Sequence, residues 1–323
     1  MKLNIPWTHI FAFLGAVLST AAYAQGYPAK SVRYIVPSLP GGGSDIVGRM
    51  MAAHLSQTFK QQVVVDNRAG GGGNIGAEIA AKSMPDGHTI FQMAVTHTIN
   101  VTLYKNLAYD LVRDFTPITR LASSPLVVTV HPSLSVKTLA DLIHATKAKP
   151  GGINFASAGT GTPTHMAVEL FNRRTGIELV HVPYKGGGGA QSSILAGETQ
   201  IYFANIVTAM PHVQSGRLRA LAVTSPKRVP LIPEYPTIAE SGYPGYESET
   251  WFGLMLPVKT PKNVAATVRS AALVALNAPE FNKRLIELAF IPIGDSAAEF
   301  TTYIQSEIAT YGKLVRELKV TSE

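Results

Sequence analysis

The chain has 323 residues, of which 46% are hydrophobic and 15% are charged. This length allows two domains, and the composition is typical of a well-packed globular protein rather than a disordered or fibrous one. The net charge of +7 is scattered over short pieces such as Lys227-Arg228, without a dense basic run interleaved with aromatics. We therefore expect a solvated charged surface and no nucleic-acid partner. The absence of cysteine excludes disulfides and thiolate metal sites.

The N-terminus has the pattern of a secretory signal. Lys2 gives a basic start, residues 10–18 form a short apolar stretch, and Ala22-Tyr23-Ala24 is a small-x-small cleavage signal. The apolar stretch is too short to span a bilayer comfortably. The sequence thus predicts an exported protein that loses residues 1–24 as a signal peptide, with a mature chain that begins near Gln25.

Short apolar strand candidates alternate with helical patterns along the rest of the chain. The expected strands are 32–36, 63–65, 89–95, 126–130, 153–156, 179–182, 201–203, 218–224 and 251–256. The clearest expected helices are 75–82, 138–148, 261–277, 279–289 and 296–318. A strand that is followed by a helix and then by another strand favours a parallel sheet with helices on its faces.

The strand order suggests one domain inserted into another. The strand at 126–130 is expected to cross into the inserted domain, and the strand at 218–224 to cross back. We predict an α/β fold of two doubly wound lobes joined by a two-strand hinge, with the ligand cleft at the carboxyl ends of the strands. Lobe 1 would comprise residues 25–124 and 225–323, and lobe 2 residues 125–224.

Four glycine-rich loops each open an expected helix. A helix N-terminus leaves its first backbone N–H groups without partners and attracts anions, and glycine lets a ligand approach that backbone closely. The loops lie in two regions of the sequence, which indicates two half-sites that face each other. They are Pro40-Gly41-Gly42-Gly43-Ser44-Asp45, Gly70-Gly71-Gly72-Gly73-Asn74, Gly159-Thr160-Gly161-Thr162-Pro163 and Gly186-Gly187-Gly188-Gly189.

Nucleotide binding is the first alternative that such loops raise. No loop matches the P-loop pattern G-x-x-x-x-G-K-[ST]. Gly71, Gly73 and Gly76 fit the dinucleotide pattern G-x-G-x-x-G, but the acidic residue expected about twenty positions later is missing. A Rossmann-type oxidoreductase that uses these glycines is the alternative function, and it predicts nicotinamide or flavin binding.

Catalytic and metal sites have little support. The chain has neither a G-x-S-x-G elbow nor an H-E-x-x-H motif. His165 and Glu169 are four residues apart and could share a metal, although packing or a helix-surface hydrogen bond is the commoner role of such a pair. We expect no catalytic residue, no metal and no cofactor. Asp45 has two open interpretations, a partner of the helix dipole or of the ligand, and Thr162 is best explained as a helix cap.

An ordered series of short motifs resembles the Bug substrate-binding proteins of the tripartite tricarboxylate transporter system. The resemblance runs through nearly all of the mature chain. The motifs are Pro37-x-x-Pro40-Gly41-Gly42-x-x-Asp45, Asn67-Arg68-Ala69-Gly70-x-Gly72-Gly73-Asn74-Ile75-Gly76, Pro85-Asp86-Gly87-His88-Thr89, Asn100-x-x-Leu103-Tyr104, Asp114-Phe115-Thr116-Pro117, His181-Val182-Pro183-Tyr184-Lys185-Gly186 and Leu218-Arg219-Ala220-Leu221-Ala222-Val223-Thr224.

The resemblance implies a periplasmic, monomeric, two-lobed protein that closes on a small organic carboxylate and delivers it to a membrane transporter. The family's first loop corresponds to residues 40–45 (the first jaw) and its facing loop to residues 157–162 (the second jaw). The implied ligand-binding residues are Pro40, Gly41, Gly42, Gly43, Ser44, Asp45, Thr96, His97, Ser157, Gly159, Thr160, Gly161, Thr162, His165 and Asn205. The loops at 70–74 and 186–189 are then expected to be tight strand-to-helix turns behind the jaws.

Three positions depart from the family pattern. Ala204 and Ser193 stand where an Asp is often found, and Ser38 stands where an aromatic or apolar residue is common. An acid lost near the cleft would change which ligand is preferred. The resemblance therefore predicts a carboxylate as the class of ligand and does not name the acid.

Overall fold

A computed structural model describes residues 26–184 and 186–321, and the predicted signal segment lies outside them. The strands are β1 (Val32–Val36), β2 (Val63–Asn67), β3 (Thr89–Ala94), β4 (Phe115–Val130), β5 (Asn154–Ser157), β6 (Val180–Pro183), β7 (Ile201–Asn205), β8 (Arg219–Val223), β9 (Glu249–Pro257) and β10 (Ile291–Pro292). They form one mixed sheet in the order β2-β1-β3-β9-β4-β7-β5-β6, and β8 and β10 both pair with β4.

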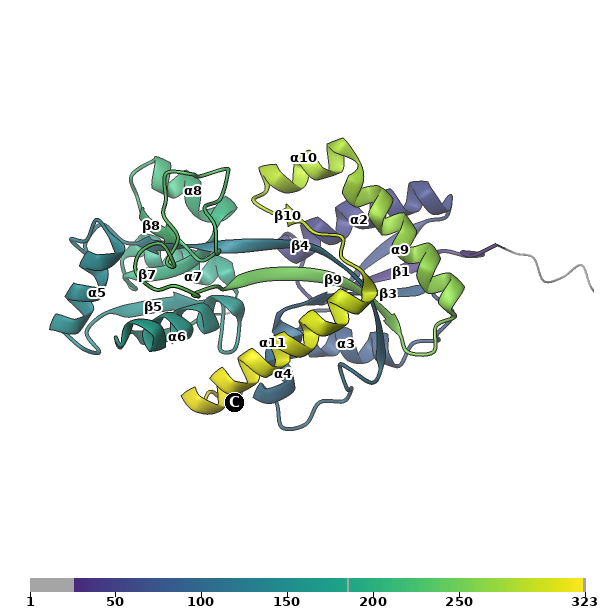
Figure 1. The fold of residues 1–323 in the computed structure, drawn as a ribbon, viewed down its shortest axis with the longest axis horizontal. Helices are drawn as coiled ribbons and strands as arrows, with labels where there is room; N and C mark the ends of the chain where they lie inside the picture. Colours follow the sequence, from purple (N-terminus) through teal and green to yellow (C-terminus); the bar gives the residue numbers. More distant parts are fainter. Residues whose placement is uncertain (1–25, 185, 322–323) are drawn as a thin grey trace, which may run out of the picture.

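Helices cover both faces of this sheet (Figure 1). They are α2 (Gly43–Phe59), the 3₁₀ turn η1 (Gly71–Gly73), α3 (Asn74–Ala81), α4 (Thr96–Leu103), α5 (Leu139–Ala148), α6 (Pro163–Thr175), α7 (Gly187–Ala196), α8 (Ile206–Gln214), α9 (Lys262–Asn277), α10 (Pro279–Glu287) and α11 (Ala297–Leu318). Within the described residues, no helix is long and apolar enough to cross a membrane.

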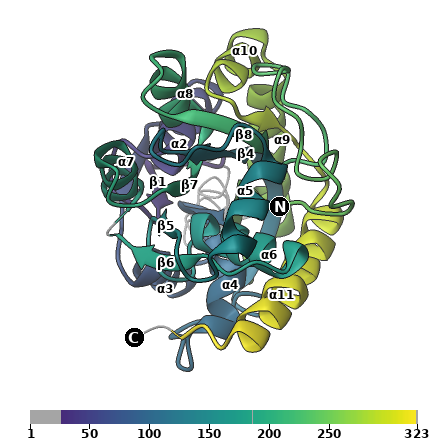
Figure 2. The same ribbon diagram turned by 90° about the vertical axis from the view of Figure 1, so that its left-hand side faces the viewer.

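Two long strands, β4 and β9, connect two groups of elements (Figure 1). The first half-sheet consists of β1, β2, β3, β9, β10 and the part of β4 that pairs with β9, up to Pro125. The second half-sheet consists of β5, β6, β7, β8 and the remaining residues of β4, Leu126 to Val130. In Figure 2 the second half-sheet and its helices face the viewer.

Each half-sheet has a core on both faces because its strands alternate their side chains. In the first half-sheet, one core contains Tyr34 with residues of α2, α9 and α10, and the other contains Ile35 with residues of α3, α4 and α11. In the second, Val128 faces a core with α5 and α6, whereas Val127 faces one with α7 and α8. Both half-sheets are therefore three-layered, and the three C-terminal helices pack on the first.

The second crossing between the half-sheets is not where the sequence predicted it. The segment 218–224 contains β8, which pairs with Val127 to Val130 of β4 inside the second half-sheet. The chain stays there after β8, because Ile238 and Tyr246 lie in the core of the second half-sheet and Thr224 donates a hydrogen bond to the carbonyl of Ser248. It is β9 that crosses back, so the prediction for 218–224 is wrong.

The pairing register gathers the strand ends at the junction of the half-sheets. Ala94, the last residue of β3, pairs with Phe252, which pairs with Ala122 of β4. Asn205, the last residue of β7, pairs with Leu126 of β4. Ala122 and Leu126 are four residues apart on one strand, about 13 Å. Since β1 is parallel to β3 and β5 is parallel to β7, all four carboxyl ends point to this junction.

Candidate functional site

The first jaw joins β1 to α2 and presents a run of unpaired backbone donors. α2 begins at Gly43, and its N-cap, Gly42, has no side chain to cap it. The N–H groups of Gly42, Gly43, Ser44 and Asp45 have no acceptor among the described residues, and the first bond of the helix is Ile46 N–H to the carbonyl of Gly42. Four consecutive free amides at a helix N-terminus favour an anion.

The side chain of Asp45 holds the first jaw in place by hydrogen bonds. Its side chain is buried, and its carboxylate accepts from the N–H of Gly41, from Nε of Arg49 and from Nδ2 of Asn67, each at 2.9 Å. Burial alone would raise the pKa of Asp45, but the hydrogen bonds from Arg49, Gly41 and Asn67 outweigh it and lower that pKa below the usual value. Both carboxylate oxygens are thus occupied within the protein.

The rest of the first jaw is fixed by two further contacts. Nε2 of the buried Gln92 donates to the carbonyl and to Oγ of Ser44, at 2.7 and 2.9 Å. A Cβ at Gly43 would lie 3.0 Å from the ring of Phe290, so this glycine leaves room for the segment after α10. Pro40, Gly41 and Gly42 are exposed.

The second jaw, by contrast, uses most of its own donors. The N–H groups of residues 158, 159, 161 and 162 donate to Oγ1 of Thr164, Oγ of Ser157, Nδ1 of His165 and the carbonyl of Gly159, respectively. Only the N–H of the exposed Thr160 has no acceptor among the described residues of this loop. The two jaws are therefore unequal, because the first offers several amides and the second offers one.

The predicted N-cap position of Thr162, with Pro163 as the first helical residue, is confirmed, but the predicted capping by its side chain is not. Thr162 stands at the N-cap of α6, but its side chain accepts no cap hydrogen bond. Its hydroxyl instead donates to the carbonyl of Gly159 at 2.6 Å. Thr162 thus tightens the turn of the second jaw rather than closing the helix end.

His165 lies under the second jaw with 4% of its surface exposed. Its Nδ1 accepts from Gly161, and its Nε2 is 3.6 Å from a carboxylate oxygen of Glu169. The predicted pairing of His165 with Glu169 is thus present in the structure. Among the described residues, no group of three or more His, Asp or Glu side chains is arranged to hold a metal ion.

Thr96 and His97 open α4 at the end of β3. The N–H groups of both have no acceptor among the described residues, so α4 also directs free amides toward the junction. The side chain of His97 is buried: Nδ1 contacts the backbone of Ala94 and Nε2 lies 3.4 Å from the carbonyl of Gly73. Burial outweighs these hydrogen bonds and lowers the pKa of His97. The backbone of His97, not its ring, is available to a ligand.

Asn205 ends β7 and forms the N-cap of α8. Its side chain is exposed and does not cap the helix, and its carbonyl accepts from Oγ1 of Thr208 at 3.0 Å. The carboxamide of Asn205 is therefore free to meet a ligand at the junction.

The glycine loop at 70–73 is a tight turn packed against α4. All four glycines have positive φ, which explains the glycine run without a ligand. Asn100 donates to the carbonyl of Gly72 at 3.0 Å, and a Cβ at Gly73 would lie 3.0 Å from Nε2 of His97. Side chains of α4 are therefore packed directly against this glycine turn.

Comparison with known protein families shows to which family the chain with this site belongs. Residues 47–320 match the model of the tripartite tricarboxylate transporter family receptor. The chain belongs to this receptor family. It is a binding protein and not an enzyme, so the oxidoreductase alternative does not hold.

Relatives of this receptor share nearly its whole length. Protein BugT of Bordetella pertussis is 33% identical over 317 residues, which is 96% of this chain and 97% of BugT. A solved structure described as R. palustris Rpa4515 with adipate is 33% identical, covers 91% of this chain and 99% of its own, and superposes with a TM-score of 0.84. The periplasmic binding protein BugD is 29% identical, covers 92% of this chain and all of its own, and has a TM-score of 0.81. The mixed α/β periplasmic-binding-protein fold is thus confirmed.

Two of the three departures from the receptor family pattern are buried. Ala204 has 0% of its surface exposed and packs in the core under α7 and α8. Ser193 has 3% exposed, and it accepts a hydrogen bond from the hydroxyl of Tyr184 at 2.6 Å. Ser38, next to the first jaw, has an enclosed hydroxyl without a hydrogen-bond partner among the described residues.

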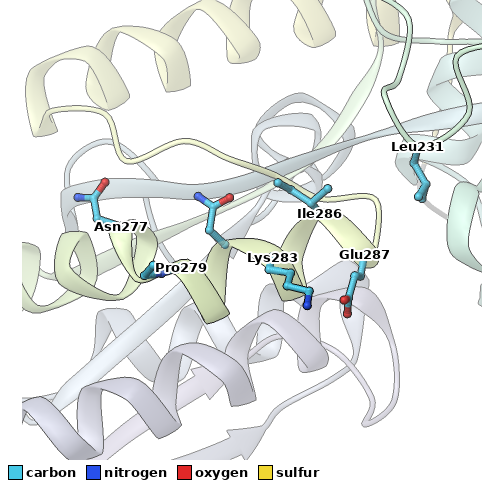
Figure 3. Close-up of a pocket in the computed structure, with 7 residues that line it drawn as sticks. Leu231, Asn277, Pro279, Lys283, Ile286 and Glu287 are labelled. Carbon is cyan, nitrogen blue, oxygen red and sulfur yellow. The ribbon is translucent and has the colours of Figure 1, made fainter.

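Two surface pockets of the receptor are lined by residues outside the jaws. A pocket of about 500 Å³ is bordered by Leu231 of the second half-sheet and by residues of α10, among them Lys283 and Ile286 (Figure 3). A pocket of about 220 Å³ lies between α4 and the loop that follows it. Neither of these two is lined by a predicted ligand-binding residue.

The side chains that hold the two jaws in place were not predicted as site residues from the sequence. Gln92 lies inside a predicted strand and Asn67 two residues after the predicted strand 63–65, at the end of the observed β2, and both hold the first jaw. His181 and Thr164 hold the second jaw. Polar residues inside or at the end of an apolar strand were the available signal, because a buried polar side chain needs a partner.

Proposed function

We propose that this receptor captures a small organic carboxylate between its two jaws and delivers it to the membrane subunits of a tripartite tricarboxylate-type transporter. The observation that carries the proposal is the run of free amides from Gly42 to Asp45, directed at the junction where four strands end. Family membership and a relative solved with adipate support a carboxylate over other anions.

The proposed ligand lies between the half-sheets and touches both. The first jaw would supply the amides of residues 42–45, α4 those of residues 96 and 97, and the second jaw the amide of Thr160. The carboxamide of Asn205 and the loop hydroxyls would complete the shell. A ligand that contacts both sides favours the closed arrangement over an open one, as a hinged receptor requires.

The proposed lobes follow the corrected crossing. Lobe 1 comprises residues 26–124 and 249–321, and lobe 2 comprises residues 125–248, so that β4 and β9 form the hinge. The proposal includes export through the signal at residues 1–24 and a monomeric receptor without cofactor.

The free amides are numerous enough for useful affinity. A hydrogen bond to an ionised group contributes about 1.5–3 kcal/mol. Micromolar binding corresponds to about −8 kcal/mol, which several such bonds supply once the ordering costs are subtracted. No arginine or lysine is needed in the shell.

The test is calorimetric titration of the mature protein with mono-, di- and tricarboxylates and aromatic acids, each compared with the matching amide. We expect at least one acid to bind and its amide not to bind. If no acid releases heat or raises the melting temperature, the proposed function is wrong.

A further inference from the structure

Three aromatic rings are stacked beneath the second jaw. The ring of His165 lies on the ring of His181, with centroids 3.8 Å apart and planes 14° from parallel. Phe155 of β5 stacks on His181 from a neighbouring position, at 4.9 Å and 21°. His181 belongs to the edge strand β6 and is not one of the predicted ligand-binding residues.

The hydrogen bonds of His165 define its protonation. Its Nδ1 accepts from the N–H of Gly161 at 3.0 Å, so Nδ1 carries no proton and the neutral ring has its proton on Nε2. That proton faces Glu169, whose carboxylate is 3.6 Å away. A proton on Nδ1 would break the bond to Gly161, and the second jaw therefore needs Nδ1 of His165 as an acceptor.

Ser157 connects His181 to the other end of the jaw. Its Oγ lies 2.6 Å from Nε2 of His181 and accepts from the N–H of Gly159 at 3.1 Å. Gly159 has φ +130°, a conformation that only glycine adopts readily, so this turn depends on its side-chain braces. His181 thus reaches both Gly159, through Ser157, and Gly161, through the stack on His165.

We propose that His181 is a positioning residue for carboxylate binding, which shapes the second jaw so that the N–H of Thr160 alone is left for the ligand. This inference rests on the proposed function. The amides of Gly159 and Gly161, on either side of Thr160, are both held inward by groups that touch His181. Loss of His181 would free the amides of Gly159 and Gly161 from these partners. The N–H of Thr160 would then no longer be held in one direction.

The electrostatics of the stack agree with this role. Burial is the main cause that lowers the pKa of His181 to about 3, and the repulsion that a charged His165 ring at 3.8 Å would exert acts in the same direction. Among the described residues, Glu169 of α6 is the one carboxylate that pairs with this stack, and it faces His165. His181 is therefore neutral at neutral pH. It acts on the second jaw through its hydrogen bond to Ser157 and through its stacking on His165.

The test is a double-mutant cycle on the mature protein, with the acid that the titration panel finds. His181→Phe keeps a ring in the stack and removes the hydrogen bond to Ser157, whereas Ser157→Ala removes that bond together with the acceptor of the Gly159 amide. We expect each change to weaken binding about tenfold or more and the double variant to bind no worse than Ser157→Ala, because His181 acts on Gly159 through Ser157. His144→Phe on the exposed face of α5 is the control and should bind like the wild type.

A ligand-free readout keeps the test independent of the proposed function. By NMR, we expect the amide protons of Gly159 and Gly161 to exchange faster with solvent in His181→Phe than in the wild type, and those of α5 to be unchanged. Unchanged exchange, wild-type affinity of His181→Phe, or multiplicative losses in the double variant would each overturn the role of His181. If the wild type binds no acid, the proposed function fails, and the exchange rates still judge whether His181 shapes the loop.

Discussion

Gly161 of the second jaw lies directly against Leu103 at the end of α4. A Cβ at Gly161 would overlap Cδ2 of Leu103, although the two residues belong to opposite half-sheets. Met166 of α6 is also buried in the core cluster of the first half-sheet that contains Trp251 and Tyr311. The two half-sheets thus touch at the second jaw. This close contact is possible because residue 161 is a glycine and has no side chain.

Gly161→Ala should therefore oppose closure of the receptor. Gly161 has φ +74°, so an alanine costs about 1–2 kcal/mol of stability and in addition forces the buried side chain of Leu103 to move. We expect carboxylate affinity to fall at least tenfold and the ligand to compact the protein less in small-angle scattering. Gly176→Ala is the matched control, because Gly176 has φ +65° and open space around a new Cβ. Equal affinities of the two variants would show that the jaw need not meet α4.

Gly42→Val should remove the first jaw from the site without unfolding the protein. Gly42 has φ −81°, which any residue adopts, and a Cβ there enters open space next to the free amides. We expect affinity to fall by about 10- to 100-fold, the loss of one charge-assisted hydrogen bond or more, at an unchanged melting temperature. Gly188→Val, which also has open space at a helix start, should bind normally in the same titration. If both variants bind alike, residues 40–45 are not part of the site.

The local sequence pattern was enough to predict where the two jaws lie, but not which side chains accept hydrogen bonds from their backbone amides. A strand followed by a Gly-Pro loop and a helix start is encoded in consecutive residues, and residues 40–45 and 157–162 occupy such positions. The partner of β8 is a long-range choice, and apolar alternation in 218–224 cannot say which strand it joins. Likewise, the rings and hydroxyls that accept from the amides of the second jaw are set by the loop geometry, so its two glycines do not reveal that a single free donor is left.

Asp45→Asn should destabilise the receptor in a pH-dependent way. The change weakens the bonds to Gly41 and Arg49 and is expected to cost about 1–3 kcal/mol of unfolding free energy at pH 7. The pKa of Asp45 in the folded protein is below its unfolded value near 3.8, so this stabilisation is present above pH 3.8 and is lost as the pH falls further. Urea unfolding at pH 7 and pH 3 should show the difference between wild type and variant shrinking. Equal differences at both pH values would mean that the charge of Asp45 is not what braces the loop.

His181 should make the wild type sensitive to mild acid. The pKa of His181 is near 6.5 when unfolded and about 3 when folded, so folding excludes a proton from the ring. The contribution of the neutral ring is complete above pH 6.5 and decreases as the pH falls from there toward 3. We expect the melting temperature to drop more between pH 7.5 and 4.5 in the wild type than in His181→Phe. Parallel curves would contradict the lowered pKa.

The ion pair between Arg173 and Glu317 should affect closure more than stability. It joins α6 to α11, the helices of opposite half-sheets, and 44% and 37% of the two side chains are exposed. An exposed pair of this kind contributes about 0–1 kcal/mol and is screened by salt. Arg173→Glu places two negative charges at the contact, so we expect a nearly unchanged melting temperature but several-fold weaker binding at low salt.

Charge exchange separates this effect from a loss of packing. The double variant R173E/E317R restores opposite charges across the contact and should recover wild-type affinity, and high salt should bring Arg173→Glu close to the wild type. Arg174→Glu is the control on the same helix, because Arg174 contacts the carbonyl of Gly245 within the second half-sheet. If that control weakens binding as much as Arg173→Glu does, general charge rather than the α6–α11 contact governs the affinity. A salt-independent loss in Arg173→Glu alone would point instead to a packing change at the end of α6.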